Sequence, residues 1–335
     1  MATDPLSDTL TLLNARCILS GGFVSGGAWS LRFPKPDRIK ISAVAKGRCW
    51  LVLDGMEPIS LGAGDVVLLN GMHPFVLASD LSVEPVDAVT VFSDRRGGTA
   101  RHGDGDDFFY LGGHIALESD GGDLLRDVLP PVIHIRASAD EATVLRWLLD
   151  QLMREMATER PGSGLASNQL AQLMFVQALR AYVEAGEAIE AGWLRAIADG
   201  RIAPALRFMH NDPGRAWTLG ELAKAAGMSR TTFALRFRQA AGVAPLGYLL
   251  GWRMHLARRA LREGKMPVSA LALSLGYTSE SAFSNAFKRA VGIAPKRYRS
   301  SVMASDDAAL DEEADNIERQ AMTGSATRLA LKVAS

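Results

Sequence analysis

Two stretches near the C-terminal end of the chain are near copies of each other: GMSRTTFALRFRQAAGVAPLGYL (227–249) and GYTSESAFSNAFKRAVGIAPKRYR (276–299). Five positions match at an offset of 50, namely Phe233 with Phe283, Phe237 with Phe287, Gly242 with Gly292, Pro245 with Pro295 and Tyr248 with Tyr298. Chance does not give five such matches, so this region contains one structural unit twice.

The stretch before each copy predicts a short helix that ends at a glycine. These stretches are LGELAKAA (219–226), followed by Gly227, and VSALALSL (268–275), followed by Gly276. Glycine adopts without strain the positive φ at which helices commonly end. A short helix and a tight turn are therefore expected at the start of both units.

A second helix is expected after each turn. Ser229 and Ser279 are residues of the type that caps a helix N-terminus. The two phenylalanines of each unit are four residues apart, so they share one helix face and point inward together. A glycine, followed three residues later by a proline, then stops this helix. Each unit is therefore a predicted helix-turn-helix.

The outward positions of the second helices separate two interpretations. A plain helical hairpin of a solenoid is the common alternative, but here the repeat occurs only twice. The outward side chains are polar or basic: Arg230, Thr231, Thr232, Arg236, Arg238, Ser281, Ser284, Asn285 and Lys288. Such side chains contact phosphates and base edges, which favours DNA binding.

The segment between the two units, LGYLLGWRMHLARRALREG (246–264), predicts one long helix. We expect it to hold the two units at a fixed separation. If both enter the major groove on one face of the duplex, that separation must be near one helical turn, roughly 34 Å.

The charge is distributed unevenly although the 335 residues have a formal net charge of zero. Residues 200–300 carry 17 Lys and Arg against 4 Asp and Glu, whereas residues 1–199 carry 17 against 26. A local positive field attracts a phosphate backbone because each neutralised phosphate releases counterions. The basic region therefore favours double-stranded DNA as a partner.

The first 135 residues have a β pattern. Short apolar segments between Ile39 and Ala78 are separated by glycines, which is typical of a sandwich or small barrel. Asp54-Gly55 predicts a hairpin turn. The stretch SDRRGGTARHGDGDD (93–107) lacks periodicity and predicts a surface loop. Cys17 and Cys49 are expected to be buried thiols, since two cysteines make no disulfide framework.

Two amphipathic helices are predicted after residue 140. In EATVLRWLLDQLMREMATER, Val144, Leu145, Leu148, Leu149, Leu152 and Met153 share one face, and NQLAQLMFVQALRAYVEAG follows the break PGSG (161–164). This pair packs either on the β domain or on the same pair of a second subunit, and the sequence leaves both open. The last 35 residues carry 3 Lys and Arg against 7 Asp and Glu and are expected to be largely disordered.

At these residues the C-terminal region resembles the AraC/XylS family of transcription regulators. The resemblance rests on Gly276-Tyr277, Ser279, Phe283, Phe287-Lys288, Gly292, Pro295 and Tyr298-Arg299. It implies a seven-helix domain with two helix-turn-helix units. Carried over to this chain, base-reading positions fall near Thr231, Ala234 and Leu235 in the first unit and near Glu280, Ser281, Ser284 and Asn285 in the second. Many relatives have arginine where this chain has Leu235, so the first unit is expected to contact a thymine methyl or to rely on Arg236 and Arg238 for backbone contacts.

The N-terminal half resembles the cupin-type sensor domain found in one branch of this family, through DPLSDTLTLL, WSLRFP, AVAKGRCWLVL and AGDVVLLNGMHPFVL. Enzymatic cupins hold a metal with histidines and a glutamate. Here Ser42 stands where the first motif has a histidine, and His73 keeps the second motif's histidine. One imidazole is a poor metal site, although His102 or His114 from the loops are possible additional ligands. No metal and no other cofactor is expected.

The expected fold is therefore an α+β multidomain chain: a cupin-like β-barrel sensor at 1–137, a helical connector at 138–198 that is a possible dimerisation region, an all-α double helix-turn-helix domain at 199–300 and an acidic tail at 301–335. Candidate ligand contacts in the barrel are Trp29, Ser42, Trp50, His73 and Phe75, each of which is alternatively a core-packing residue.

The leading hypothesis is a regulator that binds promoter DNA as a homodimer, responds to an unknown small molecule and contacts RNA polymerase. The alternatives are a metal-dependent cupin enzyme fused to a DNA-binding module and a barrel that serves only for dimerisation. No nucleotide-binding fingerprint or catalytic triad pattern occurs. The N-terminus is acidic and polar and no run of 18 apolar residues exists, so a cytoplasmic protein without a membrane segment is expected.

Overall fold

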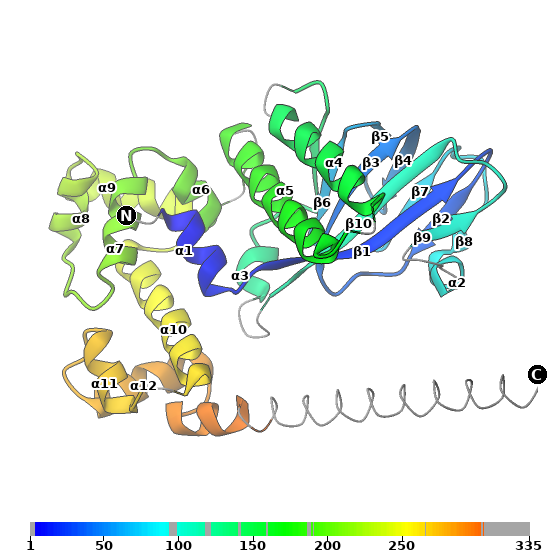
Figure 1. Ribbon diagram of the computed structural model, residues 1–335. Coiled ribbons are helices and arrows are strands. Elements are labelled where there is room, and N and C mark those ends of the chain that lie inside the picture. Colours follow the sequence, from blue (N-terminus) through cyan, green and yellow to red (C-terminus); the bar gives the residue numbers. More distant parts are fainter. Residues whose placement is uncertain are drawn as a thin grey trace, which may run out of the picture. The chain divides into compact units, whose positions relative to one another are not determined.

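The computed structural model describes residues 4–93, 99–117, 122–139, 142–158, 160–185, 189, 191–264, 266–302 and 304. The chain forms two compact units (Figure 1). The first contains the residues up to His210 together with Leu219–Pro245, and the second contains Asn211–Thr218 and the residues from Leu246 onward. The first helix-turn-helix thus groups with the N-terminal region, a division that differs from the predicted ranges.

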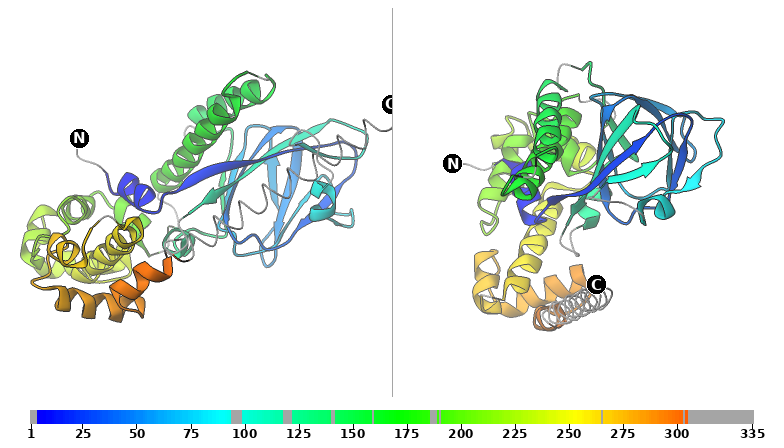
Figure 2. Two further views of the ribbon diagram at one scale, coloured as in Figure 1. Left: turned by 60° about the horizontal axis from the view of Figure 1, so that its bottom comes forward. Right: turned by 45° about the vertical axis from the view of Figure 1, so that its right-hand side comes forward.

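The first unit contains two β-sheets. The six-stranded sheet has the order β11 (Val132–Ile135), β6 (Val66–Leu69), β3 (Ile39–Lys46), β10 (Phe108–Ala116), β1 (Arg16–Ser25), β9 (Thr99–His102). The five-stranded sheet has the order β5 (Ile59–Gly62), β4 (Arg48–Leu53), β7 (Phe75–Ala78), β2 (Ser30–Phe33), β8 (Val86–Asp87). The two sheets face each other, as Figure 2 shows, and their strands supply a shared apolar core that includes Phe23, Trp29, Leu31, Leu51, Leu61 and Leu77.

Turn and loop predictions in this unit have mixed outcomes. The Asp54-Gly55 hairpin is confirmed, since β4 pairs antiparallel with β5 and Gly55 has a φ of +79°. The loop prediction for 93–107 is wrong in part, because Thr99–His102 forms β9 in parallel with Gly22–Ser25 of β1. Backbone pairing with β1, which needs no apolar pattern, places this polar segment in the sheet; residues 94–98 lie outside the described residues.

Three short helices interrupt the region that was expected to be β throughout. They are α1 (Pro5–Leu12), α2 (Ala88–Ser93) and α3 (Gly122–Arg126). The Asp4 side chain caps α1 by accepting hydrogen bonds from the backbone N–H groups of Leu6 and Ser7. This local cap explains why the N-terminal residues leave the β pattern.

The helices α4 (Ala142–Met156) and α5 (Ser163–Ala185) pack on the six-stranded sheet (Figures 1 and 2). Only Gly22–Ser25 of β1 pair with β9. The backbone of the earlier residues of β1 is bound by side chains of α5 instead. Gln172 accepts from the N–H of Cys17 at 2.6 Å, and Asn168 accepts from the N–H of Leu19 at 3.2 Å. These amides satisfy the polar groups of the strand edge. The sequence left open whether this helix pair packs on the β domain or on the same pair of a second subunit. Within one chain, it packs on the β domain.

The remaining helices form the C-terminal part of the chain. The first unit contains α6 (Trp193–Ala198), α7 (Ala203–Asn211), α8 (Leu219–Ala225) and α9 (Arg230–Ala241). The second contains α10 (Pro245–Glu263), α11 (Val268–Ser274) and α12 (Glu280–Val291), followed by helical residues 295–302. The predicted long helix over 246–264 corresponds to α10, and Pro245 is its first residue. The expected disorder of the tail beyond 304 lies outside the described residues.

Candidate DNA-binding helices and ligand cavity

The first helix-turn-helix consists of α8 and α9. Gly227 in the turn has a φ of +64°, and the Ser229 Oγ caps α9 by accepting from the N–H of Thr232 at 3.2 Å. Phe233 and Phe237 are fully buried, with ring centroids 5.6 Å apart. These contacts fix α9 on α8 and direct the opposite face of α9 to the surface.

The second helix-turn-helix, α11 and α12, repeats these features within its own unit. Ser279 caps α12 by accepting from the N–H of Ala282 at 3.1 Å, and Phe283 and Phe287 are fully buried. The turn residue Gly276 has a φ of +81°, and a Cβ there would overlap the backbone oxygen of Gly214. No other residue fits this position.

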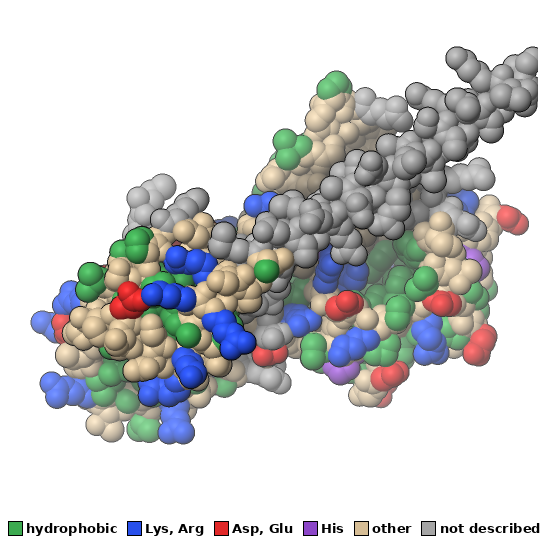
Figure 3. Space-filling model, turned by 90° about the horizontal axis from the view of Figure 1, so that it is seen from below, with side chains coloured by type: hydrophobic (Ala, Val, Ile, Leu, Met, Phe, Trp, Pro, Cys, Tyr) green, Lys and Arg blue, Asp and Glu red, His purple; other side chains and the backbone are tan. Residues whose placement is uncertain are grey.

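Most of the predicted DNA-contact residues are exposed on the outer faces of α9 and α12. The exposed ones are Arg230, Thr231, Thr232, Leu235, Arg238, Ser281, Asn285 and Lys288, and the partly buried ones are Ala234, Arg236, Glu280 and Ser284. Leu235 is 60% exposed, so its apolar side chain is accessible on the outer face of α9. Basic side chains outnumber acidic ones on the face of the helical region seen in Figure 3.

Two of these residues are engaged within the protein. The Arg236 Nε donates to the Asp199 Oδ2 at 2.6 Å, so this guanidinium is held by the loop between α6 and α7. The Glu280 carboxylate pairs with the Lys296 Nζ at 3.3 Å. Because the Arg236 Nε is bound to a carboxylate, a phosphate contact by this residue must use its other N–H groups or requires that the ion pair opens.

Burial and the Arg236 contact act in opposite directions on the Asp199 carboxyl. Burial alone would raise the pKa of Asp199, but hydrogen bonds from Arg236 and from the Arg201 backbone lower this pKa below its ordinary value. The carboxylate therefore stays ionised and holds Arg236 throughout the neutral pH range.

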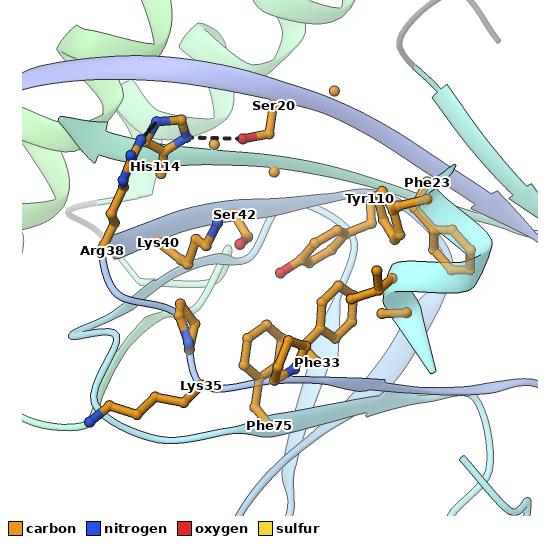
Figure 4. Close-up of a pocket in the computed structure, with 18 of the residues that line it drawn as sticks. Ser20, Phe23, Phe33, Lys35, Arg38, Lys40, Ser42, Phe75, Tyr110 and His114 are labelled. Carbon is orange, nitrogen blue, oxygen red and sulfur yellow. Dashed lines mark hydrogen bonds between the residues drawn. The ribbon is translucent and has the colours of Figure 1, made fainter. Parts of the chain in front are cut away.

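A second candidate site is a cavity of about 560 Å³ in the first unit, between the two sheets (Figure 4). Its walls come from β1, β3 and β10 on one side and from β2, β7, α2 and the segment 34–38 on the other. The volume lies within the range of small-molecule sites. Its lining includes Ser20, Phe23, Phe33, Lys35, Arg38, Lys40, Ser42, Phe75, Phe92, Tyr110 and His114.

Of the five predicted ligand contacts, Ser42 and Phe75 line this cavity. Trp29 is 1% exposed and packs against Phe108 with ring centroids 4.7 Å apart, so it belongs to the core. Trp50 lies on the side of β4 that alternates with the buried Cys49 and Leu51, away from the core. His73 is exposed in the loop before β7. Trp29 therefore has the core-packing role that was the alternative for each of these residues, Trp50 lies on the other face of its strand, and His73 lies outside the strands.

Sequence reasoning found Ser42 on β3 but did not assign Lys40 on the same strand, or Tyr110 and His114 on β10, to the ligand site. In the antiparallel pairing of these strands, Lys40 lies opposite His114 and Ser42 lies opposite Gly112. Alternation along β3 was a usable signal, because Lys40 and Ser42 are two residues apart and must share a face. The pairing partner was not visible from the sequence, since it is about 70 residues away.

The cysteines and histidines are not arranged as metal ligands among the described residues. Cys17 and Cys49 are free and buried, as predicted, and burial raises the pKa of each thiol to about 12. Within the described residues, no three His, Cys, Asp or Glu side chains are grouped as a metal would need. His102 and His114 lie in β9 and β10 rather than in loops, which corrects the sequence expectation.

Comparison with known proteins covers both halves of the chain. A family model described as Cupin matches residues 4–184, and a helix-turn-helix domain model matches residues 222–301. A protein of Streptomyces antibioticus with the name "Putative AraC-like transcription regulator" is 44% identical over 297 residues, covering 88% of this chain and 98% of the relative. The chain belongs to the AraC-type family of transcription regulators.

Other relatives agree with this family. A Streptomyces lividans protein of the same name is 43% identical, with 88% of this chain and 98% of the relative covered. Among solved structures, the DNA-binding domain of AdpA in complex with a target DNA has 31% identity, a TM-score of 0.30, and coverage of 31% of this chain and 95% of that chain. The expected fold class, a β-rich cupin domain with an AraC-type helical region, is confirmed.

The described helices are short or polar relative to a membrane span. None of them combines the length and apolar character that crossing a bilayer requires.

Proposed function

We propose that this AraC-type regulator reads its operator through the exposed faces of α9 and α12 and is controlled by a small molecule bound in the sensor cavity. The observation that carries the proposal is the matched build of the two units, in which buried phenylalanines and serine caps turn a polar face outward. On α12 this face offers Ser281, Ser284 and Asn285 to base edges and Lys288 to a phosphate.

The first helix-turn-helix, α8 and α9, contacts DNA by different chemistry. Thr231 and Thr232 lie at the N-terminal end of α9, and Leu235 offers an apolar surface suited to a thymine methyl. Arg230 and Arg238 are exposed and serve as phosphate contacts. Base discrimination is therefore assigned mainly to α12, and α9 adds backbone contacts and thymine preference.

Further parts of the proposal concern partners and location. The regulator acts in the cytoplasm as a homodimer and contacts RNA polymerase at promoters. Large apolar side chains on α4 and α5 support dimerisation, because Trp147 is 57% exposed and Leu165 is 69% exposed. Sedimentation of the wild-type chain and of Trp147→Glu tests this. A wild-type dimer that becomes a monomer in the variant identifies this surface as the interface, and a monomeric wild-type chain contradicts dimerisation.

We propose no catalytic activity. A cupin enzyme needs three converging metal ligands, and the described residues group none around His73, which is exposed. Stoichiometric metal bound to the purified chain would contradict this part of the proposal.

The experiment for the main proposal is quantitative binding of the full chain to duplexes from upstream of its own and neighbouring genes, over a salt series. The full chain is required because α8 and α9 group with the sensor. We expect one preferred sequence bound at least about 1,000-fold more tightly than random DNA. Salt-sensitive binding without a preferred sequence would reduce the helical region to a generic DNA tether.

A further inference from the structure

The sensor cavity has a basic end and an aromatic end. Figure 4 shows Arg38, Lys40 and His114 at one side of the cavity and Phe23, Phe33, Phe75 and Tyr110 at the other. At the aromatic end the rings of Phe33 and Phe75 are stacked, with centroids 4.6 Å apart and planes inclined by 6°. A ligand that fills this cavity therefore needs an apolar body and a head group suited to cations.

The basic end lacks balancing charge among the described residues. No described carboxylate forms an ion pair with Lys35, Arg38 or Lys40, and Asp37 is the single acidic side chain in the described lining. Burial and then the charge of Arg38 lower the pKa of Lys40, and Asp37 opposes them only in part. Cations gathered in this way repel one another, and an anion between them would lower their energy.

His114 holds the Arg38 guanidinium at the basic end of the cavity lining. The Arg38 Nη1 lies 3.0 Å from the His114 Nε2, and the His114 Nδ1 lies 3.2 Å from the Ser20 Oγ. A guanidinium only donates hydrogen bonds, so the His114 Nε2 accepts and its Nδ1–H donates to Ser20. Burial, then Lys40 and Arg38, lower the pKa of His114, which keeps this imidazole neutral and able to accept. The positive charge of Arg38 is thus oriented by a neutral partner that leaves it uncompensated.

The sheet also leaves space where the ligand would lie. Gly112 stands between Tyr110 and His114 on β10 and opposite Ser42 on β3. A Cβ at Gly112 would meet nothing nearer than the Tyr110 Cε1 at 3.8 Å. The absence of a side chain at this position connects the basic end of the cavity with its aromatic end.

We propose that the effector is an organic monocarboxylate with an aromatic or aliphatic body, bound with its carboxylate between Arg38 and Lys40 and its body between Phe33, Phe75 and Tyr110. The inference rests on the proposed function in one respect, that this cavity is the effector site. Arginine and lysine bind carboxylates by charge-assisted hydrogen bonds, and a half-buried site strengthens them relative to bulk water. A small inorganic anion would bind less well, because it would leave the aromatic wall of the cavity exposed to water.

The test is calorimetric titration of the full chain with three carboxylates, 1-naphthylacetate, 4-phenylbutyrate and decanoate, each against its neutral primary amide. We expect at least one acid to bind at micromolar to submillimolar concentration and at least tenfold more tightly than its amide. If no acid binds, or if every amide binds as tightly as its acid, the proposal is wrong.

Three variants locate the site. Lys40→Met should weaken the bound acid at least tenfold and reduce the difference between acid and amide, and Gly112→Val should weaken acid and amide alike by filling the cavity. Lys46→Met is the matched control, because Lys46 is on the same strand, is exposed and is absent from the lining. Thermal unfolding of each variant establishes that it is folded. Equal losses in the Lys40 and Lys46 variants would overturn the assignment.

Operator binding separates this inference from the function on which it rests. If an acid binds in the cavity and changes operator affinity, both stand. If an acid binds there and leaves operator affinity unchanged, the anion site stands and the effector role fails. If an amide alone binds and changes operator affinity, the effector role stands and the carboxylate class is wrong.

Discussion

The first helix-turn-helix, α8 and α9, and the second, α11 and α12, share their caps and their pairs of buried phenylalanines but have different neighbours. The first is joined to α6, where the Ala240 carbonyl accepts from the N–H of Gly192 at 2.8 Å. In turn, the Trp193 Nε1 of α6 donates to the Leu124 carbonyl of α3 at 2.8 Å. The second packs on Tyr298 and on residues of its own unit.

This difference assigns different tasks to two copies of one motif. The helix α9 belongs to the same compact unit as the sensor and is joined through α6 to α3, whereas α12 belongs to the second compact unit. The first copy is therefore the one suited to transmit the effector signal, and the second is free to specialise in reading bases.

Truncation of the matched core phenylalanines should damage the two copies in different ways. Phe237→Ala and Phe287→Ala each delete a fully buried ring and should cost about 3–5 kcal/mol. Phe287→Ala should unfold the second compact unit alone. Phe237→Ala should destabilise both the first helix-turn-helix and the sensor, because they belong to one compact unit. Urea unfolding followed by circular dichroism measures both. Leu273→Ala, which removes a side chain that is 66% exposed, is the control and should unfold as wild type does. A wild-type transition for Phe287→Ala would show that its inward placement is wrong.

Loss of a base-reading side chain should be a smaller and purely functional effect. Asn285→Ala should lower operator affinity by about 1–3 kcal/mol and leave binding to random DNA unchanged, because asparagine pairs with base edges. Leu235→Ala on α9 should cost less, since it removes only an apolar contact. Fluorescence anisotropy with operator and random duplexes gives both affinities. A larger loss for Leu235→Ala than for Asn285→Ala would reverse the assignment of base reading to the second copy.

The helix-turn-helix frame was predictable because its signals are local. Ser229, Ser279 and the glycines at the turns act within a few residues along the chain, and the spacing of the phenylalanines fixes the buried face of a helix. The Arg236 to Asp199 contact was not predictable, since its partner is 37 residues away in a loop. The same outward position can face DNA or be held by the protein, and only the tertiary structure distinguishes them.

The cavity was harder to predict for a related reason. Ser42 and Phe75 were identified, but the basic end requires the register of β3 against β10, which brings Lys40 opposite His114. Trp29 and Trp50 were attractive because aromatic residues often line ligand sites, yet the same side chains also fill cores. Alternation along a strand separates its residues into two faces, but it does not indicate which face lines a cavity.

Release of Arg236 should add an exposed cation to the first copy, at a position where the second copy has the buried Ala286. Asp199→Asn removes the carboxylate that holds it, so stability at neutral pH should fall, by less than for a fully buried pair because the Arg236 side chain is 42% exposed. The wild-type pKa of Asp199 is lowered in the folded state, so its contribution is present above the ordinary aspartate pKa and is lost as pH falls through the lowered value. Thermal unfolding between pH 7 and pH 3 should show this acid-side loss in wild type and less of it in Asp199→Asn. Identical pH profiles would mean that the ion pair contributes nothing.

The smallest expected effect concerns Arg238 and Lys288, which occupy matched positions in the two copies and are both exposed. Each alanine variant should weaken binding to operator and random DNA alike and reduce the slope of log K against log salt by about one, because one phosphate contact is lost. Equal slope changes would mean that both copies grip the backbone and differ only in base reading. A change for Lys288→Ala alone would mean that α9 does not touch the duplex while Arg236 is bound to Asp199. In that case Asp199→Asn by itself should increase the slope by about one, since the freed Arg236 then supplies a phosphate contact that the wild-type chain does not make. That result would make the ion pair the element through which the first copy is kept from DNA.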